Sequence, residues 1–215
     1  MAAMRSGGTF AEMAARSAEG FAVPDRVDAA AVRVLGQAAV VVYQADAAEF
    51  SRRDAAGGWA VARLDLLDLM LSLPHGLPVP DELLSAQERS MLQELPPGCV
   101  QVGSGTVIRH AVAPLRAELA VVPVRDWNRG LDRASRFAPF CARAVVLSQL
   151  PDDIDHLLIE ATYYGIGVAV AGDRDVEVLA DPQPFIRHYH KAAGWWFAEE
   201  IYGQVSGKGT TAFSA

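Results

Sequence analysis

The chain has 215 residues, of which 51% are hydrophobic and 21% are charged, and its formal net charge is -7. This composition supports a packed core and excludes wholesale disorder. A negative overall charge also excludes nucleic-acid binding that is driven by bulk charge, so any such binding requires a local basic face.

The two cysteines, Cys99 and Cys141, are far apart and lack the spacing of metal ligands. We therefore expect reduced, buried thiols, with a disulfide or a metal site as the alternative. No stretch reaches the ~18 apolar residues of a bilayer span, and no apolar region follows the first residues as in a signal peptide. These patterns predict a cytoplasmic protein with no membrane partner. The richness in Ala, Val, Arg and Asp is typical of an actinobacterial-like, high-GC composition.

Composition divides the chain into four parts. Residues 1–22 are rich in Ala, Ser and Gly and predict a flexible segment or a short helix. Residues 23–97 predict an N-terminal α/β or mainly helical region. Residues 98–205 predict an α/β core with a C-terminal helix, and residues 206–215 predict a loose, small and polar tail.

The first large part has patterns of mixed clarity. Asp28–Tyr43 is rich in Ala and Val and indicates a helix that passes into a strand, with an ambiguous period. Ser51–Gly58 is polar and indicates a turn. A helix is expected within Trp59–Leu73 because Leu64, Leu67 and Leu71 share one helical face. A second helix is expected to begin near Pro80 and to end before Pro96.

The second large part has clearer signals. Strands are expected at 99–102 and 106–112, joined by a Gly-Ser-Gly turn, and then at 116–124, 144–147, 166–171 and 176–179, the last as an antiparallel edge. Helices are expected at 126–140, 151–164 and 192–204. The helix over 151–164 is the best defined, because Ile154, Leu157, Leu158 and Ala161 have the spacing of one buried stripe.

The order helix, three strands, helix, strand, helix, strand resembles the core of the PD-(D/E)XK, or restriction-endonuclease-like, superfamily. The strand Ala117-Glu118-Leu119-Ala120-Val121 lies where that family carries an acid-x-lysine motif, and the following helix, short strand and Tyr164–Val168 segment also correspond. The resemblance covers roughly 86–179. It implies a mixed sheet flanked by helices, with a smaller, mainly helical N-terminal part, and it is compatible with a homodimer. Another α/β sandwich is the alternative fold.

In active members of that family, two acids hold a divalent metal ion and a lysine assists the attacking water. Glu118 matches the motif acid, but Ala120 stands where the lysine should be. The strand before it, expected at 106–112, offers Arg109 and His110 and no carboxylate. The resemblance therefore implies a degenerate site with Glu118 as a vestigial acid, no metal and no cofactor, unless Arg125 or Arg129 replaces the lysine.

Four arginines are the best candidates for a nucleic-acid-binding face. Their spacings of four, four and three place them on one side of the expected helix, and their guanidinium groups are suited to phosphates. The residues are Arg125, Arg129, Arg133 and Arg136. The alternative is a solvated helix face in which Asp132 pairs with a neighbouring arginine.

Acidic and aromatic residues gather further along the chain. The segment after residue 150 is rich in Asp and Glu, and the last expected helix contains Trp195, Trp196 and Tyr202. These aromatic side chains are candidates for partner binding, although core packing with a partly exposed aromatic edge is the default expectation.

Three functions follow as hypotheses. The leading one is a non-catalytic nuclease-fold protein, DNA-associated or regulatory, that acts by binding through the arginine face. The first alternative is a protein-interaction or assembly module without nucleic-acid binding. The second alternative is an active metal-dependent nuclease.

Overall fold

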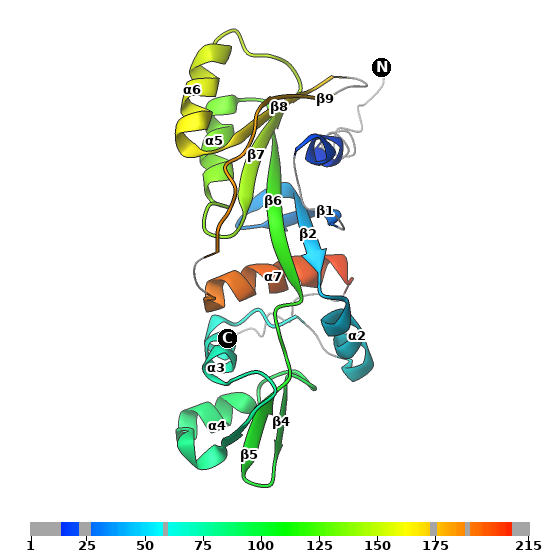
Figure 1. Ribbon diagram of the computed structural model, residues 1–215, viewed down its shortest axis with the longest axis vertical. Helices are drawn as coiled ribbons and strands as arrows, with labels where there is room; N and C mark the ends of the chain where they lie inside the picture. The colour runs from blue at the N-terminus through cyan, green and yellow to red at the C-terminus, as the bar shows by residue number, and fades with distance from the viewer. Residues whose placement is uncertain (1–13, 22–26, 58–59, 173–175, 188–189, 208–215) are drawn as a thin grey trace. The chain divides into compact units, whose positions relative to one another are not determined.

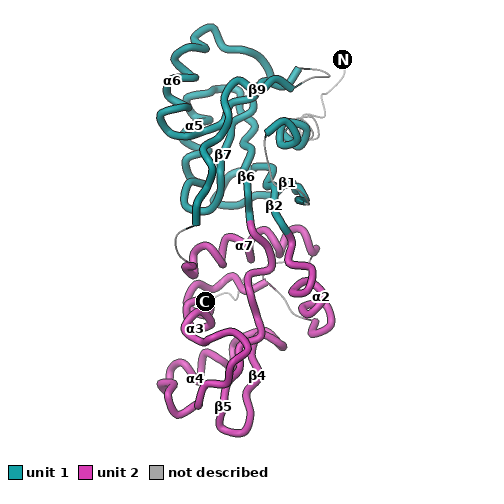
Figure 2. The backbone as a smooth tube through the Cα atoms, viewed as in Figure 1, with its two compact units in different colours: residues 1–44, 117–187 teal, residues 45–116, 188–215 magenta. Residues whose placement is uncertain are grey.

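The computed structural model describes residues 14–21, 27–57, 60–172, 176–187 and 190–207 (Figure 1). The chain forms two compact units (Figure 2). Unit 1 contains 1–44 and 117–187, and unit 2 contains 45–116 and 188–215. The division expected from the sequence, near residue 97, lies inside unit 2. The difference arises because the segment before residue 45 pairs into the same sheet as the strands after residue 117.

Unit 1 is built on a six-stranded mixed sheet, which confirms the mixed α/β class. Its strand order is β1-β2-β6-β7-β8-β9. Strands β6, β7 and β8 are parallel, whereas β1 pairs antiparallel with β2 and β9 pairs antiparallel with β8. The strands are β1 (Asp28–Val34), β2 (Gln37–Ala45), β6 (Leu115–Val124), β7 (Ala142–Leu147), β8 (Gly167–Ala171) and β9 (Val176–Ala180).

The ambiguous segment Asp28–Tyr43 is a β-hairpin, and the helix expected at its start does not form. Leu35 and Gly36 make a two-residue turn in which both have positive φ, 54° and 71°. Such turns match the twist of paired strands, and glycine accepts this conformation readily. The alanine-rich first strand is held by its pairing with β2 from Asp28↔Tyr43 to Val34↔Gln37, which a periodicity argument does not see.

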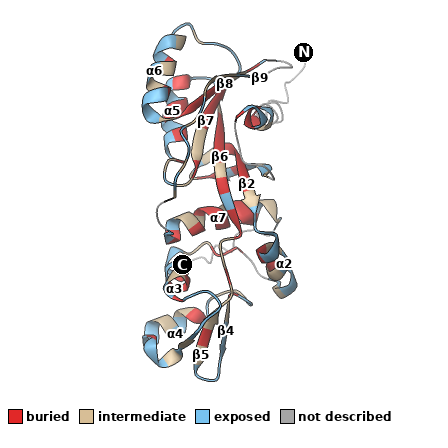
Figure 3. Ribbon diagram, viewed as in Figure 1, coloured by how far each residue is buried: buried red, intermediate tan, exposed pale blue. Residues whose placement is uncertain are grey.

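Both faces of the sheet are covered. A helix over residues 14–20 packs on one face, where Ala14, Ala18 and Phe21 join side chains from β2, β6, β7 and β8 in one buried cluster. The other face is covered by α5 (Trp127–Ser135) and α6 (Ile154–Tyr164) (Figure 1). Figure 3 shows the central strands largely buried and the outer sides of these two helices exposed.

The two crossover helices begin and end for local reasons. Asp126 caps α5, because its carboxylate accepts a hydrogen bond from the Arg129 backbone N–H at 3.4 Å. The helix stops at Ser135, earlier than the expected residue 140, because the next residues form tighter turns such as Phe137 N–H to the Ala134 carbonyl. Gly165, with φ 65°, ends α6 where it was expected to end.

Unit 2 contains a three-stranded sheet and most of the remaining helices. The strand order is β3-β5-β4, with both pairings antiparallel. The elements are α2 (Ala47–Ala56), α3 (Leu64–Ser72), β3 (Pro78–Pro80), the 3-10 helix η1 (Asp81–Leu83), α4 (Ala86–Leu92), β4 (Val100–Gly103), β5 (Thr106–Arg109) and α7 (Ala192–Val205). The segment expected as a polar turn, Ser51–Gly58, lies mostly within α2 instead.

The hairpin formed by β4 and β5 corrects the expected strand order. We expected these two strands to precede the 116–124 strand within one sheet. They do form a hairpin, but β5 pairs with β3, and the strand beside β6 in the six-stranded sheet is β2. Since β2 lies about 70 residues before β6, this neighbour was invisible to an argument from consecutive elements.

Two apolar clusters hold unit 2 together. One joins α3 and α7 through Leu67, Met70 and Trp195, and the other joins α3 and α4 to β5 through Leu73, Leu92 and Val107. A capping box at Ser85 and Glu88 begins α4. Within the part of the chain described, no helix is long and apolar enough to cross a membrane.

Candidate anion-binding site at the carboxyl end of strand β6

The candidate site lies where β6 ends and α5 begins. The helix approaches the end of the strand closely at Gly130, where an added Cβ would lie 2.8 Å from a methyl carbon of Val124. Glycine at this position therefore lets α5 pack against the last residue of β6. In open α/β sheets, ligands bind outside the carboxyl ends of the parallel strands, which is the edge where this junction lies.

Three of the four predicted arginines line one pocket at this junction. Its volume is about 350 Å³, and its lining residues are Pro123, Val124, Arg125, Asp126, Arg129 and Arg133. The Arg129 side chain is 80% exposed, and Arg133 is exposed as well. The structure thus brings together guanidinium groups from the β6–α5 turn and from the first two turns of α5.

The charge of this pocket is positive. Three arginines face one carboxylate, Asp126, which lies 3.6 Å from the Arg129 Nε. Such an exposed i,i+3 pair contributes little free energy, so Arg129 can exchange it for another anion. The partial positive charge at the start of α5 adds to the same field. A phosphate or carboxylate group is the chemistry that this lining accepts best.

Arg136, the fourth predicted arginine, is not part of the pocket lining. It lies on the exposed side of α5, at its C-cap. Its Nη1 donates to the Leu35 carbonyl at 3.4 Å, in the turn between β1 and β2. The predicted face is therefore a pocket of three arginines with a fourth arginine beyond it on the same helix.

The vestigial acid Glu118 lies at the other end of β6. Glu118 is half-buried, and Ala120 is fully buried. The residue that pairs with Ala120 in the next strand is Arg143, whose guanidinium donates to the Tyr164 carbonyl and whose pKa is lowered by burial. A basic side chain therefore stands beside the position where the resemblance calls for lysine, but it is not one of the arginines considered from the sequence.

The strand beside β6 supplies no second acid. The sequence of β2, QAAVVVYQA, contains neither Asp nor Glu. Arg109 and His110 are elsewhere, in unit 2, where Arg109 donates to the Leu73 and Ala111 carbonyls. Among the residues that the structure describes, no group of three or more His, Cys, Asp or Glu side chains is placed to hold a metal ion.

The aromatic residues proposed for partner binding lie mainly inside unit 2. Trp195 is 4% exposed and Tyr202 is 1% exposed, whereas Trp196 is partly buried against the same cluster. The Trp195 indole donates to Glu199 at 2.8 Å, and the Arg53 guanidinium lies over the Tyr202 ring at 4.8 Å. Core packing, the alternative considered from the sequence, accounts for Trp195 and Tyr202.

A buried charge network in unit 2 was missed by the sequence analysis. Arg53 donates to Glu199 through both Nη atoms at 2.7 Å and to Glu49 through Nε at 2.7 Å. Burial alone would raise the pKa of Glu49, but hydrogen bonds from Arg52 and Arg53 hold that pKa below its usual value. The only local signal is the i,i+4 spacing of Glu49 and Arg53, since Glu199 is 146 residues from Arg53.

Unit 2 also contains a larger and more apolar pocket, of about 410 Å³. Its lining includes Ala60, Val61, Leu66 and Pro96. The arginine at its edge, Arg63, forms ion pairs with Asp65 and Glu94. This arginine is already neutralised by two carboxylates, so the pocket is a weaker candidate for an anionic ligand than the one beside β6.

No family model matches the chain, and no curated protein or solved structure shows significant similarity to it. What the fold itself defines is a mixed α/β protein with a six-stranded sheet and a three-stranded sheet. What the site defines is a pocket lined by three arginines at the end of a parallel strand.

Proposed function

We propose that this chain binds nucleic-acid phosphates through Arg125, Arg129 and Arg133, with Arg136 extending the same face. The observation that carries the proposal is that the first three line one pocket beside α5. Arginine binds phosphate bidentately and keeps its charge at all relevant pH values. Because the net charge of the chain is -7, nucleic-acid binding requires a local basic face, and these arginines provide one.

The scaffold in this proposal is a nuclease-like one. The likeness is supported by a mixed sheet in which β6 carries Glu118 and is followed by a helix and then a parallel strand, β7. The antiparallel β1–β2 hairpin supplies the two preceding strands. In this proposal the segment 45–116 is an insertion between the second and third strands of that core.

The proposed mode of action is binding without cleavage. Metal-assisted phosphodiester hydrolysis needs carboxylates that hold the ion and a group that activates water. Glu118 has Ala120 at the lysine position and no acid in the neighbouring strand β2. Pairing places Arg143 beside Ala120, but a guanidinium stays protonated and cannot act as a general base.

The test is fluorescence anisotropy of labelled single-stranded and duplex DNA at two salt concentrations. We expect binding that weakens steeply with salt, because each phosphate contact releases about 0.9 counterion on duplex DNA. Arg129→Ala combined with Arg133→Ala should abolish measurable binding or lower the salt slope by about 2. Arg63→Ala is the matched control, since it removes an exposed arginine from unit 2 and should leave binding unchanged.

Two outcomes would change this proposal. If neither DNA binds at low salt, or if binding does not weaken at the higher salt concentration, the proposal is wrong. Cleavage that requires added Mg²⁺, and that is lost in Glu118→Gln, would replace it with the active-nuclease alternative. Glu118→Gln tests that point because it keeps the shape of the side chain and removes its charge.

The protein-interaction alternative is favoured by one separate observation. Helix α6 exposes three large apolar or aromatic side chains, Ile159 at 68%, Tyr163 at 82% and Tyr164 at 50%. Exposed aromatic residues bordered by charge are typical of contact surfaces. The acidic surface after residue 150, expected from the sequence, includes this helix.

A further inference from the structure

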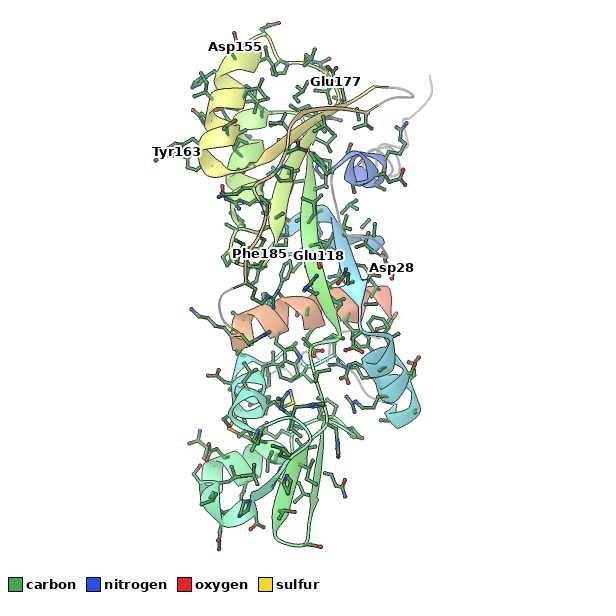
Figure 4. All side chains as sticks on the ribbon, in the orientation of Figure 1. Asp28, Glu118, Asp155, Tyr163, Glu177 and Phe185 are labelled. Carbon is green, nitrogen blue, oxygen red and sulfur yellow. The ribbon has the colours of Figure 1, made fainter. Side chains whose placement is uncertain are left out.

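The outer side of α6 carries an apolar stripe with an acidic start. Asp155, Ile159 and Tyr163 follow one another at i, i+4 and i+8, so they share one side of the helix. All three are exposed, whereas Leu157 and Ala161, on the opposite side, are fully buried. Figure 4 shows Tyr163 projecting away from the sheet. Among the residues of unit 1 that the structure describes, none covers this stripe.

The chain segment that carries that stripe is strongly acidic. From Ala144 to Asp173 the chain contains no Lys or Arg, and its carboxylates are Asp152, Asp153, Asp155, Glu160 and Asp173. His156 pairs with Glu160 at 3.0 Å on the same helix. A partner for this face must therefore bring positive charge as well as apolar contact.

The neighbouring helix α5 has the complementary surface. Its inner side is made by Trp127, Leu131 and Ala134. Its outer side presents Arg129, Arg133 and Arg136 together with one carboxylate, Asp132, so its charge is net positive. The two helices lie side by side, because the Trp127 and His156 rings are 5.4 Å apart and the Trp127 indole donates to Asp153 at 3.0 Å. One surface of unit 1 thus has a basic half and an acidic, aromatic half.

We propose that a second copy of this chain docks on this surface about a two-fold axis, with α5 of each copy on α6 of the other. A two-fold contact requires a patch that is complementary to itself, and adjacent basic and acidic helices provide one. The stripes also match in length. At the helical rise of 1.5 Å per residue, the distance along α5 from Arg129 to Arg136 is about 10 Å. The distance along α6 from Asp155 to Tyr163 is about 12 Å.

The chemistry of the contact follows from these side chains. Arginines of one copy meet the carboxylates of the other, and they also stack on Tyr163, whose ring face attracts a guanidinium. Ile159 supplies apolar surface that is removed from water on docking. This inference goes beyond the proposed function, but it uses the same arginines. A second copy and a nucleic acid therefore compete for them, and each weakens the other by the same factor.

The experiment is sedimentation velocity of the purified chain without nucleic acid, at about 50 mM and about 500 mM salt, across protein concentrations. We expect a monomer–dimer equilibrium that shifts toward monomer in high salt, because charged contacts are screened. Asp155→Lys with Glu160→Lys should weaken the dimer at least tenfold. Combining these two with Arg129→Glu and Arg133→Glu should restore it, since the pattern is then reversed on both helices.

Tyr163→Ala separates this proposal from the proposed function. It removes a stripe residue that is not one of the arginines, so it should weaken the dimer while DNA binding is kept or strengthened. A monomer at all concentrations in low salt would overturn the dimer and leave DNA binding to be judged by its own assay. An unaltered dimer in Asp155→Lys with Glu160→Lys would equally overturn it. Circular dichroism melting establishes that each variant is folded.

Discussion

Glu199 illustrates how single residues hold unit 2 together. Its side chain is fully buried, yet it accepts hydrogen bonds from Arg53, from the Val61 backbone N–H at 3.0 Å and from the Trp195 indole. A buried carboxylate is costly unless it is paired and hydrogen-bonded. Because all these donors are present, Glu199 links α7 to α2 and to the start of the segment that leads into α3.

Removing the arginine from this network should be strongly destabilising. Arg53→Met leaves two buried carboxylates, Glu49 and Glu199, without their main cation, and we expect a loss of about 3–5 kcal/mol in the free energy of unfolding. Urea denaturation measures it. Arg52→Met is the matched control, since Arg52 binds Glu49 from a 28% exposed position and should cost about 1 kcal/mol or less. Equal losses for the two variants would contradict the role of burial.

At the scale of elements, α5 connects the fold to the candidate site. It is nine residues long and carries Arg129 and Arg133 one turn apart. Its distance from β6 is set by Gly130, which faces the Val124 side chain. The contact between Gly130 and Val124 thus sets how close the arginine-bearing turns of α5 lie to the end of β6.

Gly130→Ala tests that contact. Alanine is intrinsically favoured in a helix by about 1 kcal/mol, but its Cβ would lie 2.8 and 2.9 Å from the two Val124 methyl carbons. We expect a net loss of about 1–3 kcal/mol from overpacking, measured by thermal unfolding. We also expect weaker DNA binding, because α5 must shift. Adding Val124→Ala should recover most of both losses, whereas a neutral or stabilising Gly130→Ala would show that the contact relaxes freely.

The chain passes from one unit to the other three times. The chain crosses between them after residues 44, 116 and 187, and the first two crossings fall within strands β2 and β6. At these two crossings the chain is therefore part of a strand and not of a loop. We therefore expect the two units to unfold together.

The two cysteines report on this cooperativity. Cys141 belongs to unit 1 and Cys99 to unit 2, and both are buried. Burial raises the pKa of Cys141 to about 12 and that of Cys99 to about 11, so both thiols should resist a disulfide reagent at pH 8. In the Cys99→Ser and Cys141→Ser variants, the reagent should label the one remaining thiol as urea is increased. The urea concentration at half labelling should be the same for both variants. Clearly separated midpoints, in variants of equal stability, would show that the units open independently.

Several elements could be predicted from local pattern. Helix α6 was found from its stripe of Ile154, Leu157, Leu158 and Ala161. The edge strand β9 was found from its position after a buried strand. Helix α2 was missed, because its buried residues are Glu49 and Arg53 and a polar sequence indicates a turn. The alternation of β1 was missed because alanine fits both a helix and a strand.

The candidate site was also partly predictable from local pattern. Arg125, Arg129 and Arg133 are close in sequence, so helical spacing alone placed them on one side. That they line a pocket depends on the approach of α5 to Val124, and the neighbour of Ala120 depends on the register of β6 with β7. Neither could be seen in a local pattern, because both arise from contacts across the sheet.

The amino-acid sequence was sufficient for what depends on near neighbours: the α/β composition, most helices and strands after residue 98, and the arginine-rich side of α5. The pairing of β2 with β6, the separate sheet of β3, β4 and β5, and the burial of Trp195, Tyr202 and Glu199 required the folded chain. The physical reason is that these contacts join segments far apart in the sequence, from Pro78 and Ile108 in β3 and β5 to Arg53 and Glu199, which are 146 residues apart. The free energy of such contacts depends on the packing of the whole core and not on any local propensity.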